Sequence, residues 1–442
     1  MKRIKCKVGT EIEAWVFSKR DVSDGIFSSN SQQFPSMLID EFKKVYKRKA
    51  KSEAKKYLFY PSLEYDDSIH WDGATTEVAF KPSKNMEEYY EILSGGISLI
   101  YDLCKRKGWY YLHSGCTPCS GSGAGAHTHI SGLPVNTMFY KLWTYQPFIG
   151  LLSQNSPMNS RGLSDVTKDT RLLNSSWATY TSSLGEGSAL SADRKGSGYR
   201  TVEVRIPSDT TLIHMVGIAS FIKACLLVND NFKFNDNTNN SLYNSVKARG
   251  TDASLTVKLT DTVKLLGFKI RYVPIPINVL FSILIKYGEL HEALHMVLSE
   301  LPSGIRGKVI KFYELISDGY TFSDYIFDYF SAWFKRNYPK FDYTNYNTDY
   351  TSSTRILNVK KDVNKEFIKL MHTIGRRSYQ RNIPFWEQLP KPVNNRFTER
   401  ELISRINKSS SSSFTLSKLS IKDNILRCIE SDSQYRRTWT KK

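Results

Sequence analysis

Short runs of alternating apolar and polar residues occupy the first half of the chain. This period of two is typical of a β-strand with one buried face. The runs predict five strands, at 4–17, 75–80, 109–115, 126–131 and 200–206. Apolar residues spaced three or four apart predict helices at about 85–107, 136–153 and 210–229. Strands spaced so irregularly favour an α+β protein, with helices covering one face of an antiparallel sheet.

The pattern changes near residue 235 and is mostly helical from there on. The clearest helical stretches are NVLFSILIKYGELHEALHMVLSEL (278–301) and GKVIKFYELI (307–316). Polar segments rich in turn-forming residues interrupt the pattern at 338–354 and 407–414. We therefore divide the chain into a sheet domain (1–235), a helical region (236–336), a polar linker (337–360) and a basic, partly flexible helical region (361–442).

Composition limits the class of protein. A hydrophobic content of 40% is too high for a disordered chain. The longest apolar run, INVLFSILI, is far shorter than the roughly 20 residues of a membrane span, and the start has no hydrophobic signal core. Six scattered cysteines in so long a chain favour reduced thiols over a disulfide framework. We expect a cytoplasmic protein with no membrane partner.

The chain is strongly basic, with a formal net charge of +19. The excess is concentrated in FKKVYKRKAKSEAKK (42–56) and YRRTWTKK (435–442). Such surfaces attract nucleotides, nucleic acids or acidic peptides. An ordinary solvated helix face has the same appearance, so charge alone leaves both interpretations open.

Ionisable residues two positions apart recur in three of the predicted strands. Such residues point to the same side of a strand. The three pairs are Glu11 with Glu13, His127 with His129, and Glu203 with Arg205, and Glu77 lies on a fourth strand. Carboxylates crowded on one face repel one another, so we expect a cation among them. Carboxylates suit Mg²⁺, an imidazole favours Mn²⁺, and an arginine fork binds phosphate oxygens, which together predict a metal–nucleotide site.

The same stretches resemble motifs of the glutamine synthetase superfamily of carboxylate-amine ligases, in particular glutamate-cysteine ligase type 2 and related amidoligases. In family order over residues 8–209, they are VGTEIEAWVF, TTEVAF followed by KPS, HSGCTP, GSGAGAHTHISG, NSPMNSRG and YRTVEVRIPSD. HSGCTP departs from the Gly-Thr-His-Pro type of motif at Cys116 and Thr117. Nothing after residue 235 contributes to the resemblance.

The resemblance implies a sheet of the glutamine-synthetase catalytic type in residues 1–235, binding ATP and Mg²⁺ or Mn²⁺. It implies amide-bond formation through an acyl phosphate on a glutamate-type carboxylate, with small-molecule or peptide carboxylates and amines as substrates. The implied metal ligands are Glu13 and Glu77 for one ion, and Glu11, His127 and Glu203 for the second. Glu203, Arg205, Arg161 and Arg171 are the implied catalytic residues, with Arg205 at the γ-phosphate, and His129 and Ser131 would line the nucleotide pocket. Glu64, Asp67 and Asp72 are alternates for further carboxylate ligands.

Three alternatives remain open. Cys116 and Cys119 precede His127 and His129 closely enough for a Cys/His zinc site, although the spacing is shorter than in familiar Cys₂His₂ units. The charge, the 26 tyrosines and the basic tail suit a nucleic-acid-binding or structural protein, but there is no helix-turn-helix, RNP or zinc-finger signature. The third alternative is a ligase scaffold that binds nucleotide without turnover.

Overall fold

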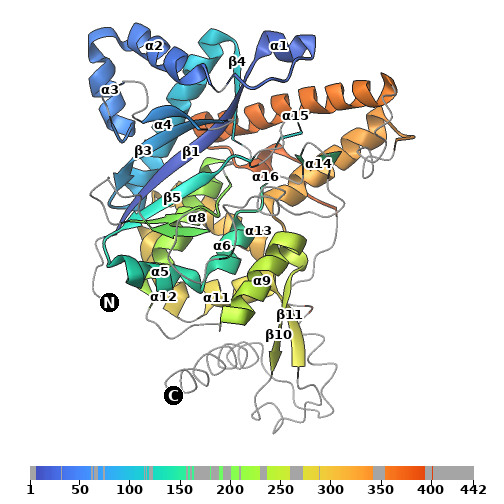
Figure 1. The fold of residues 1–442 in the computed structure, drawn as a ribbon. Coiled ribbons are helices and arrows are strands. Elements are labelled where there is room, and N and C mark those ends of the chain that lie inside the picture. The colour runs from blue at the N-terminus through green and yellow to red at the C-terminus, as the bar shows by residue number, and fades with distance from the viewer. Residues whose placement is uncertain are drawn as a thin grey trace.

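A seven-stranded antiparallel sheet forms the centre of the computed structural model (Figure 1). The strand order is β2 (Ile69–Asp72), β3 (Thr75–Ser83), β1 (Lys7–Ser18), β5 (Ala126–Ser131), β9 (Val202–Val204) and β8 (Leu190–Ala192), and β4 (Trp109–Leu112) pairs with β1. The first half of β1 pairs with β5 and its second half with β4, while β3 runs along its other side. The longest strand therefore holds the sheet together.

The structure describes most of the chain up to residue 393. The described residues are 6–30, 32–60, 63, 68–72, 75–113, 115, 117–118, 123–155, 158–159, 162–163, 180, 189–192, 201–208, 211–228, 236–258, 272–287, 289–341, 354–393 and 401. Statements about the fold and the site refer to these residues.

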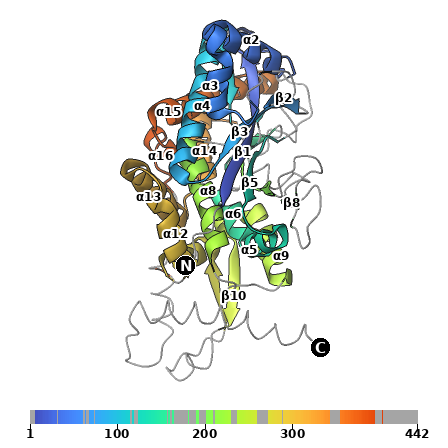
Figure 2. The same ribbon diagram turned by 90° about the vertical axis from the view of Figure 1, so that its left-hand side faces the viewer.

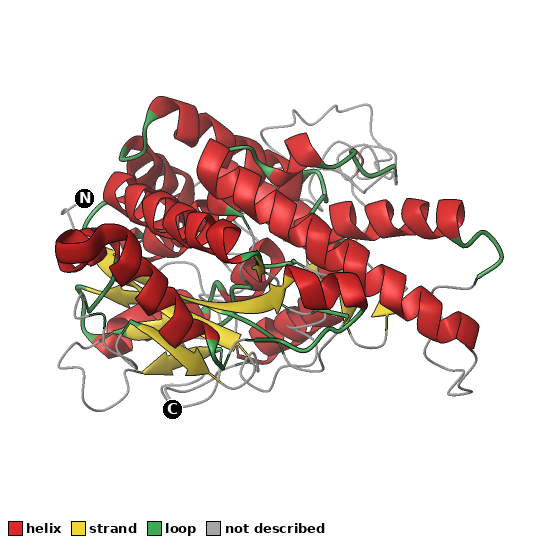
Figure 3. Cartoon of the chain, turned by 90° about the horizontal axis from the view of Figure 1, so that it is seen from above, coloured by secondary structure: helices red, strands yellow, loops and turns green. Residues whose placement is uncertain are grey.

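One face of the sheet is apolar and carries a layer of helices (Figures 2 and 3). Ile12, Val78 and Ile130 on this face are fully buried. The layer next to it consists of α2 (Phe34–Tyr46), the 3₁₀ turn η1 (Lys47–Lys49), α3 (Ala50–Tyr57) and α4 (Met86–Lys107). A Cβ atom on Gly96 of α4 would lie 2.6 Å from the ring of Phe80 on β3, so the backbone of the helix packs directly against this side chain of the sheet. We call this side the back of the sheet.

Helix α4 has sequence signals at both ends. The Asn85 side chain accepts a hydrogen bond from the Glu88 backbone N–H at 2.8 Å, which caps the first turn. Gly108 ends the helix with a φ of 70°, a conformation that glycine adopts without strain. The helix therefore begins and ends where the sequence provides its caps.

Helix α8 (Leu212–Leu227) lies at the centre of the packed helices. All its residues from Leu212 to Leu226 are buried. It packs against α4, α5, α6, α12, α13 and α15. A helix that is apolar all round needs cover on every side, and the second half of the chain provides part of it.

The remaining described elements are mainly helical. They are α1 (Lys19–Asp24), α5 (Val135–Trp143), α6 (Gln146–Leu152), β6 (Met158–Asn159), β7 (Gly162–Leu163), α9 (Asp236–Arg249), η3 (Gly250–Asp252), β10 (Ser254–Lys258), β11 (Tyr272–Pro276), α11 (Ile277–Lys286), α12 (Glu289–Ser299), α13 (Ser303–Ser317), α14 (Phe322–Asn337), α15 (Thr354–Arg381) and α16 (Phe385–Gln388). Helix α15 returns to pack against α4 and β4 (Figure 1). None of the described helices combines the length and apolarity that a membrane crossing requires.

The α+β class, the antiparallel sheet and the mainly helical second half agree with the sequence prediction. The strand at 126–131 is confirmed at both ends, and the helix at 85–107 to within one residue. The single helix expected at 136–153 is wrong: Pro147, near the start of α6, disfavours a continuous helix and the chain forms α5 and α6 instead. A hairpin, β10–β11, lies in the region expected to be helical, where Pro274 and Pro276 oppose a helix.

Candidate active site

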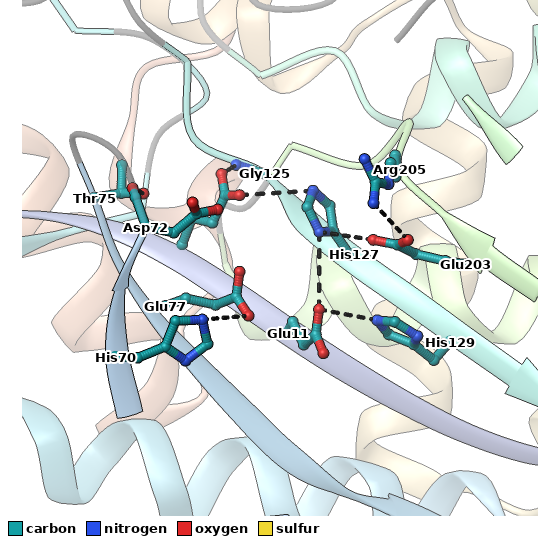
Figure 4. A network of polar contacts seen from close by, with 11 residues as sticks. Glu11, His70, Asp72, Thr75, Glu77, Gly125, His127, His129, Glu203 and Arg205 are labelled. Atoms are coloured by element: carbon teal, nitrogen blue, oxygen red, sulfur yellow. Dashed lines mark hydrogen bonds and ion pairs between the residues drawn. The ribbon is translucent and has the colours of Figure 1, made fainter. Parts of the chain in front are cut away.

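The polar face of the sheet brings ionisable side chains from four neighbouring strands together. Glu11 of β1 lies opposite His127 of β5, and Glu13 lies opposite Glu77 of β3. Glu203 of β9 lies opposite His129 of β5. Since residues two apart share a face, the antiparallel register turns separate sequence pairs into one cluster (Figure 4).

The side chains in this cluster are in direct contact. The His127 Nδ1 atom lies 3.1 Å from Glu203 Oε1 and 4.0 Å from Glu11 Oε2. The His129 Nε2 atom lies 3.0 Å from Glu11 Oε2. The two imidazoles therefore separate the carboxylates of β1 from that of β9.

The remaining groups lie on either side of these imidazoles. Arg205 Nη2 lies 2.9 Å from Glu203 Oε2, and His127 Nε2 lies 3.8 Å from Glu13 Oε1. Glu13 also accepts a hydrogen bond from the backbone N–H of Gly125. The guanidinium thus lies at one side of the cluster and Glu13 at the other.

The edge strand β2 adds two ionisable residues that lie beside Glu77. His70 lies opposite Glu77 in the strand register, and its Nε2 atom is 3.3 Å from Glu77 Oε1. Asp72, two residues further along, belongs to the same side of the strand and is exposed. The site therefore extends from the edge of the sheet to β9.

The surroundings of Glu77 and Glu203 shift the pKa values of these two carboxyl groups in opposite directions. Burial raises the pKa of Glu77 well above its ordinary value, and the charges of Glu11 and Glu13 raise it further. Burial also opposes ionisation of Glu203, but the hydrogen bond and charge of His127 outweigh it and lower the pKa of Glu203 to about 2. The carboxylate beside the imidazoles and arginine is stabilised as an anion, whereas the one among other carboxylates is not.

Glu11 behaves like Glu203. Burial opposes its ionisation, and the hydrogen bond and charge of His129 more than compensate, so the pKa of Glu11 is lowered. The imidazoles and the guanidinium therefore offset negative charge near β5 and β9. On the β3 side, Glu77 contacts the imidazole of His70 and lies close to the carboxylates of Glu11, Glu13 and Asp72.

Three overlapping groups of side chains offer ligand atoms within 4.8 Å of one another. They are Glu13 with Asp72 and Glu77, Glu11 with His129 and Glu203, and Glu11 with Glu77 and His127. The first group is composed of carboxylates alone, the ligands that Mg²⁺ prefers. The other two each include one imidazole, which Mn²⁺ accepts more readily.

The structure brings together most, but not all, of the residues singled out in the sequence. Glu11, Glu13, Glu77, His127, His129, Glu203 and Arg205 share the cluster. Ser131 lies at the end of β5, opposite Lys7 and half-buried. Arg161 and Arg171, the alternates Glu64 and Asp67, and the zinc candidates Cys116 and Cys119 lie outside the described residues.

Sequence reasoning did not include His70 and left Asp72 as an alternate. The segment IHWD shows the same arrangement as the other strands, with two ionisable residues two positions apart. Its four residues are too few for alternation to distinguish a strand from a loop. Only the pairing of β2 with β3 shows that these side chains lie beside Glu77.

No protein-family model matches the sequence, and no curated protein matches it significantly. Among solved structures, the chain is similar to PafA, the ligase of the prokaryotic ubiquitin-like protein Pup, with 9% identity over 92% of this chain and 94% of that one, at a TM-score of 0.44. It is also similar to glutamate-cysteine ligase from Francisella tularensis, solved with AMP, with 12% identity over 98% of this chain and 99% of that one, at a TM-score of 0.41. The apo structure of GmaS is 14% identical over 77% of this chain and 73% of that one, at a TM-score of 0.37. The similarity is one of overall arrangement, so the functional argument below depends on the side chains of the site.

Proposed function

We propose that this chain is an ATP- and magnesium-dependent carboxylate-amine ligase that joins a glutamate-type carboxylate to an amine through an acyl phosphate. The observation that carries the proposal is the cluster on the polar face of the sheet. Four carboxylates, two imidazoles and one guanidinium converge there from β1, β3, β5 and β9 (Figure 4). Such a set is suited to a metal-bound triphosphate.

The residues present fit divalent cations. Burial raises the pKa of Glu77, and the charges of Glu11 and Glu13 add to the shift, which supports a cation beside it. Glu13 and Asp72 complete an all-carboxylate group around Glu77. Glu11 and Glu203 would hold a second ion together with an imidazole, either His127, as the sequence motifs imply, or His129. When bound, these ions would neutralise charge on the triphosphate and on the phosphoryl group in transfer.

The side chains of the protein would mainly position the reactants and balance their charge. Arg205, oriented by its 2.9 Å contact with Glu203, would bind γ-phosphate oxygens. A substrate carboxylate oxygen attacks the γ-phosphorus and ADP leaves. The amine then attacks the acyl carbon, phosphate leaves, and an amide bond forms. Neither step requires a side-chain nucleophile. Arg161 and Arg171 remain candidates for assisting the nucleotide or the carboxylate.

A hydroxamate assay tests the proposal directly. Purified protein is incubated with ATP, Mg²⁺, hydroxylamine and a panel of glutamate-containing carboxylates, and both hydroxamate and ADP are measured. We expect an acceptor-dependent signal that Glu203→Ala abolishes. Because Glu203 is buried against His127 and Arg205, the isosteric Glu203→Gln is measured alongside, with circular dichroism to show that both variants fold.

Glu314→Ala provides the matched control. Glu314 is an exposed glutamate on α13 that, among the described residues, pairs with Lys311, and its removal should leave the activity unchanged. ADP release that survives both Glu203 substitutions would refute this assignment of the site. Nucleotide binding without acceptor-dependent ADP formation, across a full screen of carboxylate and amine pairs, would instead identify an inactive ligase scaffold.

A further inference from the structure

A second feature, separate from the carboxylate cluster, lies on the outer side of the helices that cover the back of the sheet. Eleven cationic side chains are exposed there; we call them the basic surface. They are Lys43, Lys44, Lys47, Arg48, Lys49, Lys51, Lys55 and Lys56 of α2, η1 and α3, and Lys105, Arg106 and Lys107 at the end of α4. The buried side of the same helices packs against Ile69 and Phe80 of the sheet. The basic surface and the carboxylates therefore face in different directions.

The two parts of the basic surface are joined by contacts between α2, α3 and α4. Lys107 Nζ of α4 lies 3.3 Å from Glu41 Oε2 of α2. Burial raises the pKa of the Tyr46 hydroxyl, the charge of Glu53 on α3 raises it further, and the charge of Arg106 on α4 opposes these effects. Tyr46 therefore lies among residues from all three helices, which places the cations of α2, η1 and α3 close to those at the end of α4.

Most of the positive charge on this surface is uncompensated. Four acidic residues accompany the eleven cations: Asp40, Glu41, Glu53 and Asp102. Glu41 is paired with Lys107, Glu53 with Lys56 at 2.8 Å, and Asp102 accepts a hydrogen bond from Gln380 at 2.9 Å. Within the described part of the chain, none of the other nine cations takes part in an ion pair. The surface has an excess of seven positive charges, a large share of the formal +19 of the chain.

The composition of the basic surface suits contacts to a phosphate backbone that have no fixed geometry. Nine of its eleven cations are lysines, which meet phosphate as compact point charges, whereas bidentate recognition of phosphate or carboxylate would favour arginine. Lys51 and Lys55 are one helical turn apart on α3, so their side chains project side by side. Tyr46 and Tyr57, both partly exposed, add hydroxyl donors of the kind that contact nucleic-acid backbones.

An anionic membrane fits the surface less well. Peripheral membrane helices insert large apolar side chains between the lipids. Among the described residues, the exposed large apolar side chains include none from residues 42–57. A polymer that presents phosphates without requiring insertion matches the surface better.

We propose that the basic surface binds nucleic acid through its phosphate backbone, as a second function independent of the ligase site. Contacts of this kind carry no sequence information. Their strength comes from the release of counterions, so it must fall steeply with salt. The number of lysines that contact phosphate determines the slope of the logarithm of the binding constant against the logarithm of the salt concentration.

The test compares two triple variants of the full chain by fluorescence anisotropy. The probe is a labelled single-stranded RNA of about twenty nucleotides, titrated between about 50 and 200 mM salt. The test variant is Lys47→Ala/Lys51→Ala/Lys55→Ala. The control, Lys311→Ala/Lys335→Ala/Lys340→Ala, removes the same charge from exposed positions on and just after α13 and α14. We expect the parent and the control to bind alike. The test variant should bind on the order of tenfold more weakly at low salt, and its logarithmic salt slope should be smaller by about 2.

Two further measurements distinguish this function from its alternatives. Glu203→Gln should bind the RNA like the parent, and the lysine triple variant should retain the full hydroxamate activity of the parent. Equal RNA affinity of the test and control variants would overturn the proposal. So would loss of RNA binding in Glu203→Gln, which would place the RNA in the ligase site. Displacement of the RNA by polyglutamate at equal charge concentration would also overturn it and indicate an acidic polypeptide as the partner.

Discussion

Glu77 is the carboxylate whose ionisation the rest of the site opposes most. It lies opposite Glu13 and beside His70, and its side chain is 9% exposed. Its pKa in the folded protein is raised well above that of the unfolded chain, so folding retains the proton. The resulting contribution of Glu77 to the free energy of unfolding is present below the pKa of the unfolded chain, about 4.3. It is lost as the pH rises through the pKa of the folded protein. In the absence of a cation at neutral pH, a charged Glu77 destabilises the fold.

Substitution of Glu77 by glutamine should therefore stabilise the metal-free protein. The amide keeps the shape of the side chain beside His70, but it removes the unfavourable charge. We expect the free energy of unfolding at pH 7 in EDTA to rise by about 1 kcal/mol or more. We also expect that Mg²⁺, which should raise the melting temperature of the parent, will have a much smaller effect on the variant.

Thermal melts in EDTA and in Mg²⁺ measure both effects. Glu314→Gln, at the exposed glutamate on α13, serves as the control and should match the parent in each condition. A Glu77→Gln variant that is less stable in EDTA and retains the full response to Mg²⁺ would show that Glu77 holds no metal and is not strained by its neighbours.

At the scale of single elements, much of the site could be predicted because successive side chains along a strand point to opposite faces. TEIE, AHTHIS and TVEVRI each show which two side chains share a face, because that depends only on backbone geometry. Alternation does not show which strands are neighbours. The contact between His70 and Glu77 depends on β2 and β3 pairing. The sequence does carry a hairpin signal there, Asp72-Gly73, but IHWD is too short to be recognised as the strand that would precede the turn.

No sequence pattern predicted the contacts between segments that lie far apart in the chain. Helix α15 begins more than two hundred residues after β4, yet His372 accepts a hydrogen bond from the backbone N–H of Tyr111 at 3.1 Å. The ring also packs edge-on against Tyr101 and Tyr110. The three-to-four spacing of apolar residues on a helix shows that it has a buried side, but not what covers it.

This junction between α15 and β4 makes stability depend on pH. Burial lowers the pKa of His372 from 6.5 to about 4, and the approach of its Nδ1 atom to the Tyr111 carbonyl oxygen, at 3.3 Å, only partly opposes the shift. Between these values the unfolded chain binds more protons than the folded one, so the free energy of unfolding falls as the pH falls. The contribution is complete above pH 6.5 and its loss reaches about 3 kcal/mol near pH 4.

The variant His372→Gln isolates this contribution, since a glutamine side chain can still accept from Tyr111 and does not titrate. Urea unfolding of parent and variant is compared at intervals from pH 7.5 to about pH 4.5. Carboxylates that titrate in the same range are common to both proteins and cancel in the difference. We expect the stability advantage of the parent to shrink steadily below pH 6.5. A constant difference across the range would mean that His372 is not held neutral at this junction.

At the scale of the whole molecule, the two halves of the chain share one core. Helix α8 belongs to the first half by sequence, and α12 and α13 of the second half pack against it. A Cβ atom on Gly217 of α8 would lie 2.7 Å from the ring of Phe312 on α13, and Tyr313 donates a hydrogen bond of 2.6 Å to the Gly217 carbonyl. The Lys223 ammonium of α8 pairs with Glu300 at 2.7 Å. Close packing therefore joins the segments on either side of residue 235, where the hydrophobic pattern changes.

A fragment of residues 1–235 tests whether that change marks an independent domain. The fragment leaves Gly217 and Lys223 of α8 without their partners, Phe312 and Glu300. Because each large buried side chain that loses its cover costs about 1.5–3 kcal/mol, a marginally stable fold does not survive several such losses. We expect the fragment to aggregate, or to bind a hydrophobic dye and melt without a cooperative transition.

The matched control is a chain that ends at residue 393, which retains every helix and strand that the structure describes. This longer chain should melt in one cooperative transition and remain soluble. A fragment of residues 1–235 that stays soluble, melts cooperatively and gains stability from Mg²⁺ would establish the opposite arrangement. In that case the carboxylate cluster would sit in a domain that folds alone, and the helical half would be needed only for substrates. Failure of the short fragment to fold would instead mean that the carboxylate cluster forms only in a chain long enough to cover α8.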